Sequence, residues 1–325
     1  MSTVTQAGPA APAGPAPLSE RRPLGDRGFQ VLALACGLLV LVILVLIAVS
    51  TTQQASSWFT TEGTKIFTSN WDPTTGNYGA LTFIYGTAIT AVIALVLAVP
   101  VSVGIALLLT EVVPYRWSRP IVYVVDLLAV VPSVVWGLWG ILVFAPWVAH
   151  IYAHIGNVLN GVWVLGPLFG PPTSGASFFT AGIILAFMIT PIVTSLSREV
   201  IATVPAIDKE GAYALGATRL EMIRGAVWPH SQGGVVGAVL LGLGRAMGET
   251  IAVALVIGSS PVITSHLFAP GYNMPAVIAN EFGESFGLQR AALMGIGVLL
   301  FAFTIIINII ARGIVERSAR RKRGA

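Results

Sequence analysis

The sequence predicts an all-α membrane protein, a polytopic bundle of six transmembrane helices. Of its 325 residues, 55% are hydrophobic and only 10% are charged, and the mean hydropathy is +0.83. Soluble domains carry about 25% charged residues. Six apolar segments reach the length of about 20 residues that a helix needs to cross a bilayer. The alternating ten-residue strands of a β-barrel, the other spanning architecture, are absent from the sequence.

The first predicted span, 29–50, follows a distinct N-terminal zone. Residues 1–19 are rich in Ala, Pro and Gly without apolar periodicity, so residues 1–28 are expected to form a disordered cytoplasmic tail. A signal peptide is the alternative interpretation, because arginines precede the apolar run. Signal peptides have apolar regions of about 7–15 residues, whereas the run Phe29–Val49 has 21. An uncleaved transmembrane helix is therefore predicted.

Five further segments complete the predicted transmembrane domain, 29–313, and a basic cytoplasmic tail, 314–325, follows it. Pro100 in the second span predicts a kink or a tilt, and Pro132 with the stretch 137–140 predicts an irregular third span. These five spans are expected at 80–110, 120–147, 177–203, 234–258 and 289–312.

Lysine and arginine positions predict the orientation of the spans. Fifteen of these residues fall in the two terminal tails, in the connections after the second and fourth spans, or at the adjoining span ends, as Arg198 and Arg312 do, against Lys65 and Arg290 on the other side. Cytoplasmic loops of membrane proteins carry the excess of Lys and Arg. Both termini and the loop 204–233 are therefore expected to be cytoplasmic, in a multi-pass protein of the inner membrane.

The outward loops 51–79, 148–176 and 259–288 are long and nearly uncharged. Their aromatic residues are expected to act as interface anchors, with a docking surface as the alternative. These residues are Trp58, Trp71, Tyr78, Trp163 and Tyr272.

No cofactor, metal site or nucleic-acid partner is predicted. The single cysteine, Cys36, excludes an intramolecular disulfide and a cysteine cluster. His150 and His154 could share a helix face, but no third ligand is near them in the sequence. The basic residues are spread over short loops and tails rather than gathered in a patch.

The loop 204–233 carries the most specific signal. Its residues predict a short helix, a turn at Gly216–Ala217 and a second amphipathic helix through Leu220, Ile223 and Val227, closed by Pro229. Two short helices that protrude from the membrane suggest a docking partner, with a surface hairpin of no consequence as the alternative.

This loop resembles the EAA loop of binding-protein-dependent ABC importer permeases. Gly211, Ala226 and Trp228 depart from the usual residues of that motif, but all three are small or apolar. In that family the loop docks onto the ATPase subunit, which implies ATPase coupling here and a MetI-like fold. The coupling residues that the resemblance implies are Glu210, Gly211, Ala212, Gly216 and Pro229.

Longer strings resemble the PstC-type permeases of phosphate-specific importers, over roughly residues 60–315. They include the WDP sequence at 71–73, the stretches 132–140 and 191–199, and the run GLGRAMGET at 242–250. The resemblance implies a phosphate permease and four partner types: a PstA-like sister subunit in a heterodimer, two PstB-like ATPases, a PstS-like extracytoplasmic phosphate-binding protein, and membrane lipid. A permease for another oxyanion, such as sulfate, molybdate or phosphonate, is the alternative.

Charged residues inside the predicted spans are candidates for a translocation path. Arg245 and Glu249 are four residues apart and are expected on one face of the fifth span, where the same resemblance implies that they take part in phosphate passage. Charges within a membrane usually face a cavity or a partner, so a structural pair is the alternative. Asp126 is expected to make an interhelical hydrogen bond, and Glu199 a structural pair with Arg198.

The chain is expected to transport rather than to catalyse. It contains no GxxxxGK[ST] phosphate loop, so ATP hydrolysis must belong to a separate subunit. An intramembrane enzyme or a secondary carrier would need paired carboxylates within a span or inverted repeats. Neither is found in the sequence.

Overall fold

The computed structural model describes residues 24–159, 166–170 and 174–323, with side chains from residue 28 to residue 313 within these ranges. The chain divides into two units, residues 1–50 and residues 51–325. The helices are α1 (Leu24–Glu62), α2 (Leu81–Leu107), α3 (Tyr115–Val130), α4 (Ser133–Trp139), α5 (Ala145–Leu159), α6 (Phe178–Ala202), α7 (Ala206–Ala214), α8 (Arg219–Met222), α9 (Trp228–Gly248), α10 (Ile251–Val256), α11 (Met274–Glu281) and α12 (Gly287–Arg323), and the strands are β1 (Trp71–Asp72) and β2 (Asn77–Tyr78).

The described part of the first unit is the N-terminal portion of helix α1. Its large apolar side chains from Phe29 to Val49 are exposed all around the helix. A helix that is apolar on every side suits a lipid environment, as predicted for the first span. Residues 1–23 of the predicted tail lie outside the described residues, and α1 begins at Leu24.

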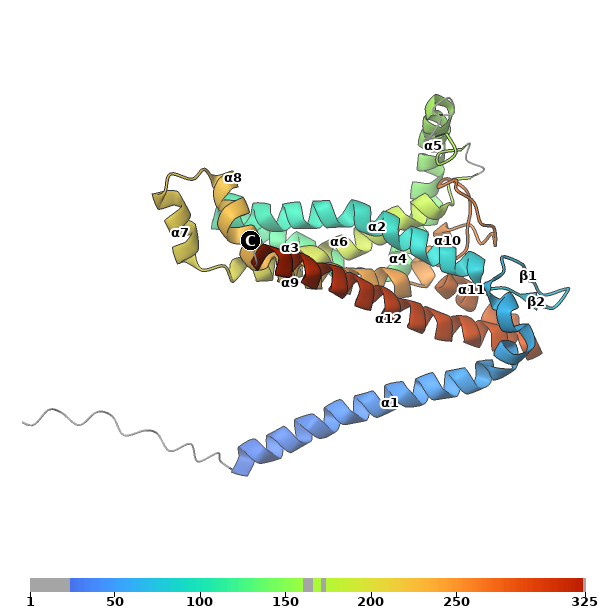
Figure 1. Ribbon diagram of the computed structural model, residues 1–325. Helices are drawn as coiled ribbons and strands as arrows, with labels where there is room; N and C mark the ends of the chain where they lie inside the picture. Colours follow the sequence, from blue (N-terminus) through green and yellow to red (C-terminus); the bar gives the residue numbers. More distant parts are fainter. Residues whose placement is uncertain (1–23, 160–165, 171–173, 324–325) are drawn as a thin grey trace, which may run out of the picture. The chain divides into compact units, whose positions relative to one another are not determined.

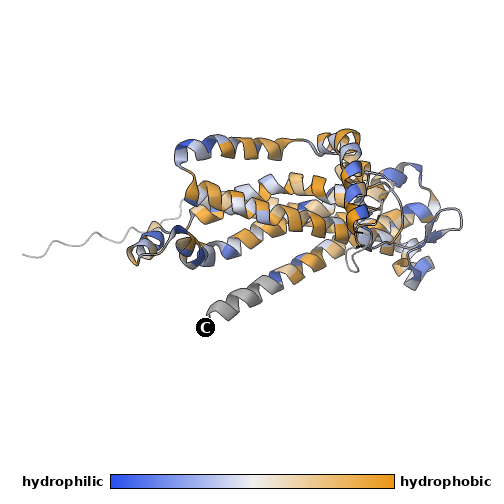
Figure 2. Ribbon diagram, turned by 90° about the horizontal axis from the view of Figure 1, so that it is seen from above, coloured by the Kyte–Doolittle hydropathy of each residue, from blue (hydrophilic) through white to orange (hydrophobic). Residues whose placement is uncertain are grey.

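The second unit is built on three helices, α2, α6 and α9, which pack against one another (Figure 1). Close packing of these helices requires glycine at several positions, of which Gly182 and Gly242 are examples. A Cβ on Gly182 would lie 2.4 Å from Cγ2 of Ile93, and a Cβ on Gly242 would lie 2.6 Å from Cγ2 of Val193. Small residues that let helix backbones approach are typical of membrane bundles. Figure 2 shows apolar residues along the shafts of the long helices and polar residues mainly toward their ends.

The three predicted outward loops meet at one end of this unit. The indole Nε1 of Trp71 donates to Oε2 of Glu281 over 3.0 Å. The amide of Leu267 donates to the carbonyl of Leu168 over 2.8 Å, which joins the second and third loops. The short antiparallel pair β1–β2 sits in the first loop, with Trp71 opposite Tyr78.

The prediction that the outward aromatics serve as interface anchors is wrong for the four that the structure describes. Trp58, Trp71, Tyr78 and Tyr272 are all less than 9% exposed, because they form the core of the joined loops; Trp71 packs edge-on against Tyr78 and Phe83. Trp163 lies outside the described residues. Buried aromatic pairs of this kind stabilise the packing of the joined loops.

The predicted count of six spans is not matched, because five described stretches are long and apolar enough to cross a membrane. The fifth predicted span, 234–258, is split: helix α9 ends at Gly248 and α10 begins at Ile251. Although the 21 residues of α9 would extend about 31 Å, the helix is not among the stretches that meet the hydropathy requirement.

The third predicted span, 120–147, is broken at Pro132. Helix α3 ends at Val130 and α4 begins at Ser133, since the residue before a proline is driven toward extended backbone. A π-helical turn, Gly140–Phe144, then joins α4 to α5, and 133–159 becomes the spanning stretch. The predicted irregularity is confirmed, whereas the predicted boundaries are shifted. At the C-terminus, α12 continues helically into the predicted tail as far as Arg323.

Segments expected on the same side of the membrane gather at the same end of the second unit. Helices α7 and α8 lie at the opposite end of the bundle from the strands β1 and β2 (Figure 1). This arrangement is what the predicted topology requires, with loop 204–233 facing the cytoplasm.

Thiol labelling tests that orientation. In a Cys36→Ser background, cysteines at Thr75 and Ser174 are expected to react with an impermeant thiol reagent added to intact cells, because both are exposed in the outward loops. A cysteine at Gly324 is expected to react only after the cells are opened. Labelling at Gly324 in intact cells would reverse the assigned orientation.

Candidate functional site

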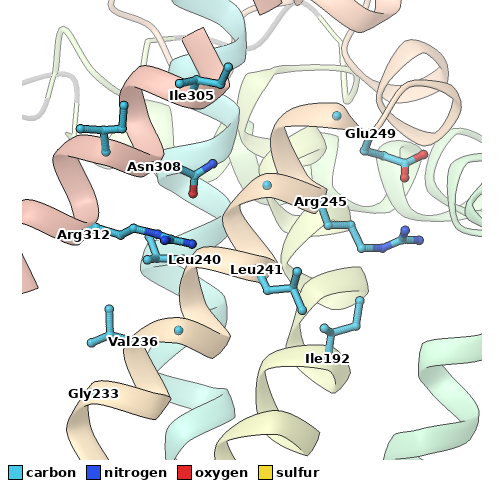
Figure 3. A pocket seen from close by; sticks show the side chains of 14 residues that line it. Ile192, Gly233, Val236, Leu240, Leu241, Arg245, Glu249, Ile305, Asn308 and Arg312 are labelled. Carbon is cyan, nitrogen blue, oxygen red and sulfur yellow. The ribbon is translucent and has the colours of Figure 1, made fainter. Parts of the chain in front are cut away.

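An open groove of about 1260 Å³ runs along helix α9. Helix α12 forms one wall, and Ile192 of α6 contributes to the other. Most of the lining is apolar, with a few polar side chains that include two arginines. These polar residues are Arg245, Glu249, Asn308 and Arg312 (Figure 3).

The floor of the groove is nearly bare backbone, because four glycines of α9 line it. A Cβ added at any of the four would meet no atom within 4 Å. Pairs of small residues four positions apart often permit close helix packing in membranes. Within the described chain the pairs of this helix face open space instead, so this face is free for a ligand or for a second chain. The glycines are Gly233, Gly237, Gly244 and Gly248.

Arg245 and Glu249 do not share one continuous helix, contrary to prediction. Helix α9 ends at Gly248, and Glu249 is extended, with φ −69° and ψ 126°. Its Oε1 accepts a hydrogen bond of 3.4 Å from the amide of Ala252. Among the described residues no ion pair joins Glu249 to Arg245. Both still line the groove and project on the side where Ile192 lies (Figure 3).

The two residues differ in burial, and this difference determines what each can do. Glu249 is only 8% exposed, whereas the Arg245 side chain is exposed in the groove. The arginine therefore presents its guanidinium to the groove, and among the described residues no acid forms an ion pair with it. A planar guanidinium with five N–H donors matches the geometry of a tetrahedral oxyanion.

Asn308 and Arg312 belong to this groove but were not among the predicted site residues. They extend from α12 toward α9, opposite Arg245 (Figure 3), and Asn308 Nδ2 donates to the carbonyl of Thr304 over 3.0 Å. Arg312 had been counted only as a cytoplasmic positive charge. The sequence did contain a signal for these two residues: an amide and a guanidinium stand four positions apart, on one face of the last predicted span.

The other two intramembrane acids lie outside the groove. Asp126 is exposed on α3, which has no buried residue, and makes no hydrogen bond that joins it to another helix within the described residues. Glu199 is exposed near the end of α6, and no ion pair with Arg198 is found in the described part of the chain. The structure thus separates both from Arg245 and Glu249.

Helices α7 and α8 form the two short helices predicted for loop 204–233, and most of the residues of its EAA-like motif are exposed. Glu210, Gly211, Gly216 and Pro229 are exposed, while Ala212 is half-buried against a small core that includes Met222. Four large apolar side chains of this loop are exposed to solvent: Ile207, Tyr213, Leu215 and Leu220. Ile207 is 75% exposed and Leu215 is 91% exposed, which is typical of a protein-docking surface.

Local chemistry fixes the turn of this loop. Gly216 has φ +84°, a conformation that side-chain-bearing residues rarely adopt. Its amide donates to the carbonyl of Tyr213, and the Ala217 amide donates to the carbonyl of Ala212. This pair of bonds is the Schellman arrangement that ends many helices.

The second helix of the loop begins with a capping box. The Thr218 hydroxyl accepts from the Glu221 amide, and the Glu221 carboxylate accepts from the Thr218 amide. The hydrogen bonds that the ionised carboxylate accepts from the Thr218 amide and from the Thr218 hydroxyl lower the pKa of the Glu221 carboxyl. The capping box therefore favours one start position for α8 at neutral pH.

The prediction that Pro229 closes the second helix is wrong. The chain runs on helically from Arg219 to Gly248 through a π-helical turn, Ile223–Val227. Pro229 is the second residue of α9 and directly follows this π-helical turn, which interrupts the regular hydrogen bonding that a proline cannot join. The loop is therefore continuous with the helix that carries Arg245.

The fold and the groove define a multi-pass membrane subunit with a docking loop at one end. Residues 98–324 match the family described as binding-protein-dependent transport system inner membrane component. Three relatives bear the name phosphate transport system permease protein PstC. That of Haemophilus influenzae is 42% identical over 87% of this chain and 91% of its own length. That of Mesorhizobium japonicum is 42% identical over 98% of both, and PstC 2 of Mycobacterium tuberculosis is 41% identical over 89% and 91%. The chain therefore belongs to this inner-membrane family and, within it, to the PstC permeases.

Two solved structures show the same fold at low sequence identity. A chain of a bacterial ABC transporter involved in the import of the acidic polysaccharide alginate has a TM-score of 0.57 at 14% identity, over 90% of this chain and 96% of that chain. A chain of the MetNI methionine ABC transporter in an inward-facing conformation has a TM-score of 0.50 at 16% identity, over 74% and 94%. The predicted MetI-like permease fold is confirmed.

Proposed function

We propose that this chain is the transmembrane permease subunit of an ATP-driven phosphate importer. It has no catalytic role, and a separate subunit hydrolyses ATP. Its similarity to PstC permeases over nearly the whole chain supports phosphate as the substrate. The single observation in the structure that best supports this function is the exposed Arg245 guanidinium in a groove with an open glycine floor.

The groove offers what a phosphate ion needs on leaving water. Phosphate carries one to two negative charges at neutral pH, and an unpaired charge in an apolar medium is very costly. Arg245 and Arg312 supply positive charge in the groove, and Glu249 offsets part of it. A partly offset charge lowers the barrier for the anion without trapping it. Arg245 and Glu249 thus form the proposed translocation path.

The partners follow from the two ends of the protein. The exposed residues of α7 and α8, with Glu210, Gly211, Ala212, Gly216 and Pro229, dock onto a PstB-like ATPase, and a sister subunit docks a second copy of it. The sister, of PstA type, completes the path along the open face of α9. The joined outward loops receive a PstS-like phosphate-binding protein. Both termini of the chain are cytoplasmic.

Uptake of radiolabelled phosphate tests the substrate. In a strain lacking its own phosphate importer, expression of this chain with its partner subunits is expected to restore uptake at micromolar phosphate. Excess unlabelled phosphate should compete, whereas excess sulfate, molybdate or phosphonate should not. Competition by one of these other oxyanions, with weak competition by phosphate, would favour the alternative substrate class.

A further inference from the structure

One ion pair joins the coupling loop to the transmembrane helices. Nζ of Lys209, on α7, lies 2.6 Å from Oε1 of Glu111. Glu111 belongs to the π-helical turn Leu108–Val112 that ends helix α2. The two residues are 98 positions apart in the sequence, so the pair bridges two separate elements. No other ion pair is found among the side chains that the structure describes.

The pair is shielded from water to an extent that surface pairs are not. The Lys209 side chain is 22% exposed and that of Glu111 only 6%. Solvent-exposed pairs contribute little because water and salt screen them. A charge as buried as that of Glu111 needs its partner, since removing one member of a buried pair leaves an uncompensated charge. The attachment should therefore be sensitive to either substitution.

Helix α7 has few other attachments to the bundle. None of its residues is buried, and Ala212 is its residue that packs against the nearby core. That core brings together Ala106 of α2, Ile201 of α6 and Val235 of α9. Lys209 thus adds a polar link from α7 to the end of α2, beside the place where these three helices meet.

This link leads to the groove. Helix α2 packs along α6 and α9, and α9 carries Arg245. The loop joins α9 through the π-helical turn Ile223–Val227, and the ion pair joins it to the π-helical turn of α2. Such turns mark functional positions in many helices. Motion of the docking helix can therefore reach the groove by two routes, and the ion pair is the one that can be altered without changing the loop backbone.

We propose that Lys209 and Glu111 are positioning residues that transmit movement of the ATPase-docking helix α7 to helix α2 during transport. The proposal rests on the proposed importer function. It assigns neither residue to substrate binding. It requires that loss of the pair separate ATP hydrolysis from phosphate movement, because ATPase docking remains while the link to α2 is lost.

The test uses the assembled complex of permease subunits, ATPases and binding protein in lipid vesicles, with phosphate uptake and ATP hydrolysis measured together. Glu111→Gln and Lys209→Gln are each expected to lower uptake about tenfold, the change that about 1.4 kcal/mol of coupling free energy produces, with hydrolysis close to that of the unmodified complex. The reversed pair, Glu111→Lys with Lys209→Glu, should regain most of the uptake. Arg116→Gln, an exposed arginine at the same end, is the matched control and should behave as unmodified.

Three outcomes would overturn the proposal. Normal uptake in both single variants would show that the pair transmits nothing. A proportional loss of uptake and hydrolysis would assign it to assembly alone. If the single variants fail to assemble, and the reversed pair assembles but does not transport phosphate, the pair likewise serves assembly alone. If the unmodified complex hydrolyses ATP but imports no phosphate, the proposed function fails instead, which separates the two conclusions.

Discussion

Replacing Arg245 with glutamine is expected to lower phosphate uptake by about a hundredfold, the size of effect that loss of one anion-stabilising donor has in enzymes. Glutamine retains hydrogen-bonding capacity and much of the side-chain length but removes the positive charge that offsets the phosphate. Because the Arg245 side chain is exposed in the groove, its replacement leaves no buried partner unpaired. The amount of protein in the membrane should therefore be unchanged, and uptake by cells together with an immunoblot of membranes measures both quantities.

Graded variants distinguish a path residue from a structural one. Arg245→Lys is expected to retain part of the uptake, since it keeps the charge and loses the planar fork of donors. Glu249→Gln should also reduce uptake, because the positive charge of the groove is then no longer offset and phosphate is held longer. Arg116→Gln removes an exposed arginine outside the groove and should leave uptake normal. A loss confined to assembly in the Arg245 variants would assign the residue a structural role.

Changes in the coupling loop are expected to have an equally large effect by another route. Gly216→Val places a β-branched side chain at φ +84°, and left-handed backbone costs ordinary residues about 1–2 kcal/mol. The Schellman turn should open and turn Leu215 away from the docking surface. Uptake should fall to background while the transmembrane helices remain intact, because Gly216 has open space around it. Copurification of the ATPase from solubilised membranes measures docking directly.

Two companion variants make this result specific. Gly225→Val introduces the same side chain at another exposed position of the loop with open space and no positive φ, so docking and uptake should persist. Glu210→Lys reverses an exposed charge of the loop and should abolish docking without altering the turn. Normal copurification with both Gly216→Val and Glu210→Lys would show that the ATPase docks elsewhere.

The coupling loop was predictable because short-range chemistry determines it. A glycine at the end of an apolar run and a threonine followed three residues later by glutamate are sufficient to place the turn and the second helix start. The membrane class followed from composition alone. These features depend on neighbours in the sequence. The structure confirms the turn predicted at Gly216–Ala217, whereas the helix end predicted at Pro229 is wrong.

The groove was less predictable, because it depends on which helix faces meet. The end of α9 at Gly248 has no proline beside it. Helix α9 ends where the backbone of Glu249 becomes extended and its carboxylate accepts a hydrogen bond from the Ala252 amide. Asn308 joins the site only because α12 packs along α9. The glycines of α9 look alike in sequence, yet Gly242 is packed tightly and Gly244 faces open space. Long-range packing makes this distinction.

In the proposed function, phosphate crosses the membrane past Arg245, driven by ATP hydrolysis in a separate subunit that docks at the coupling loop. Vesicles that contain the complete complex test it most directly, with ATP on the side of α7 and α8 and with labelled phosphate and its binding protein on the other. ATP-dependent phosphate accumulation is expected with the unmodified chain and almost none with Arg245→Gln, although ATPase docking and hydrolysis persist. Equal accumulation by both complexes would contradict the proposed function.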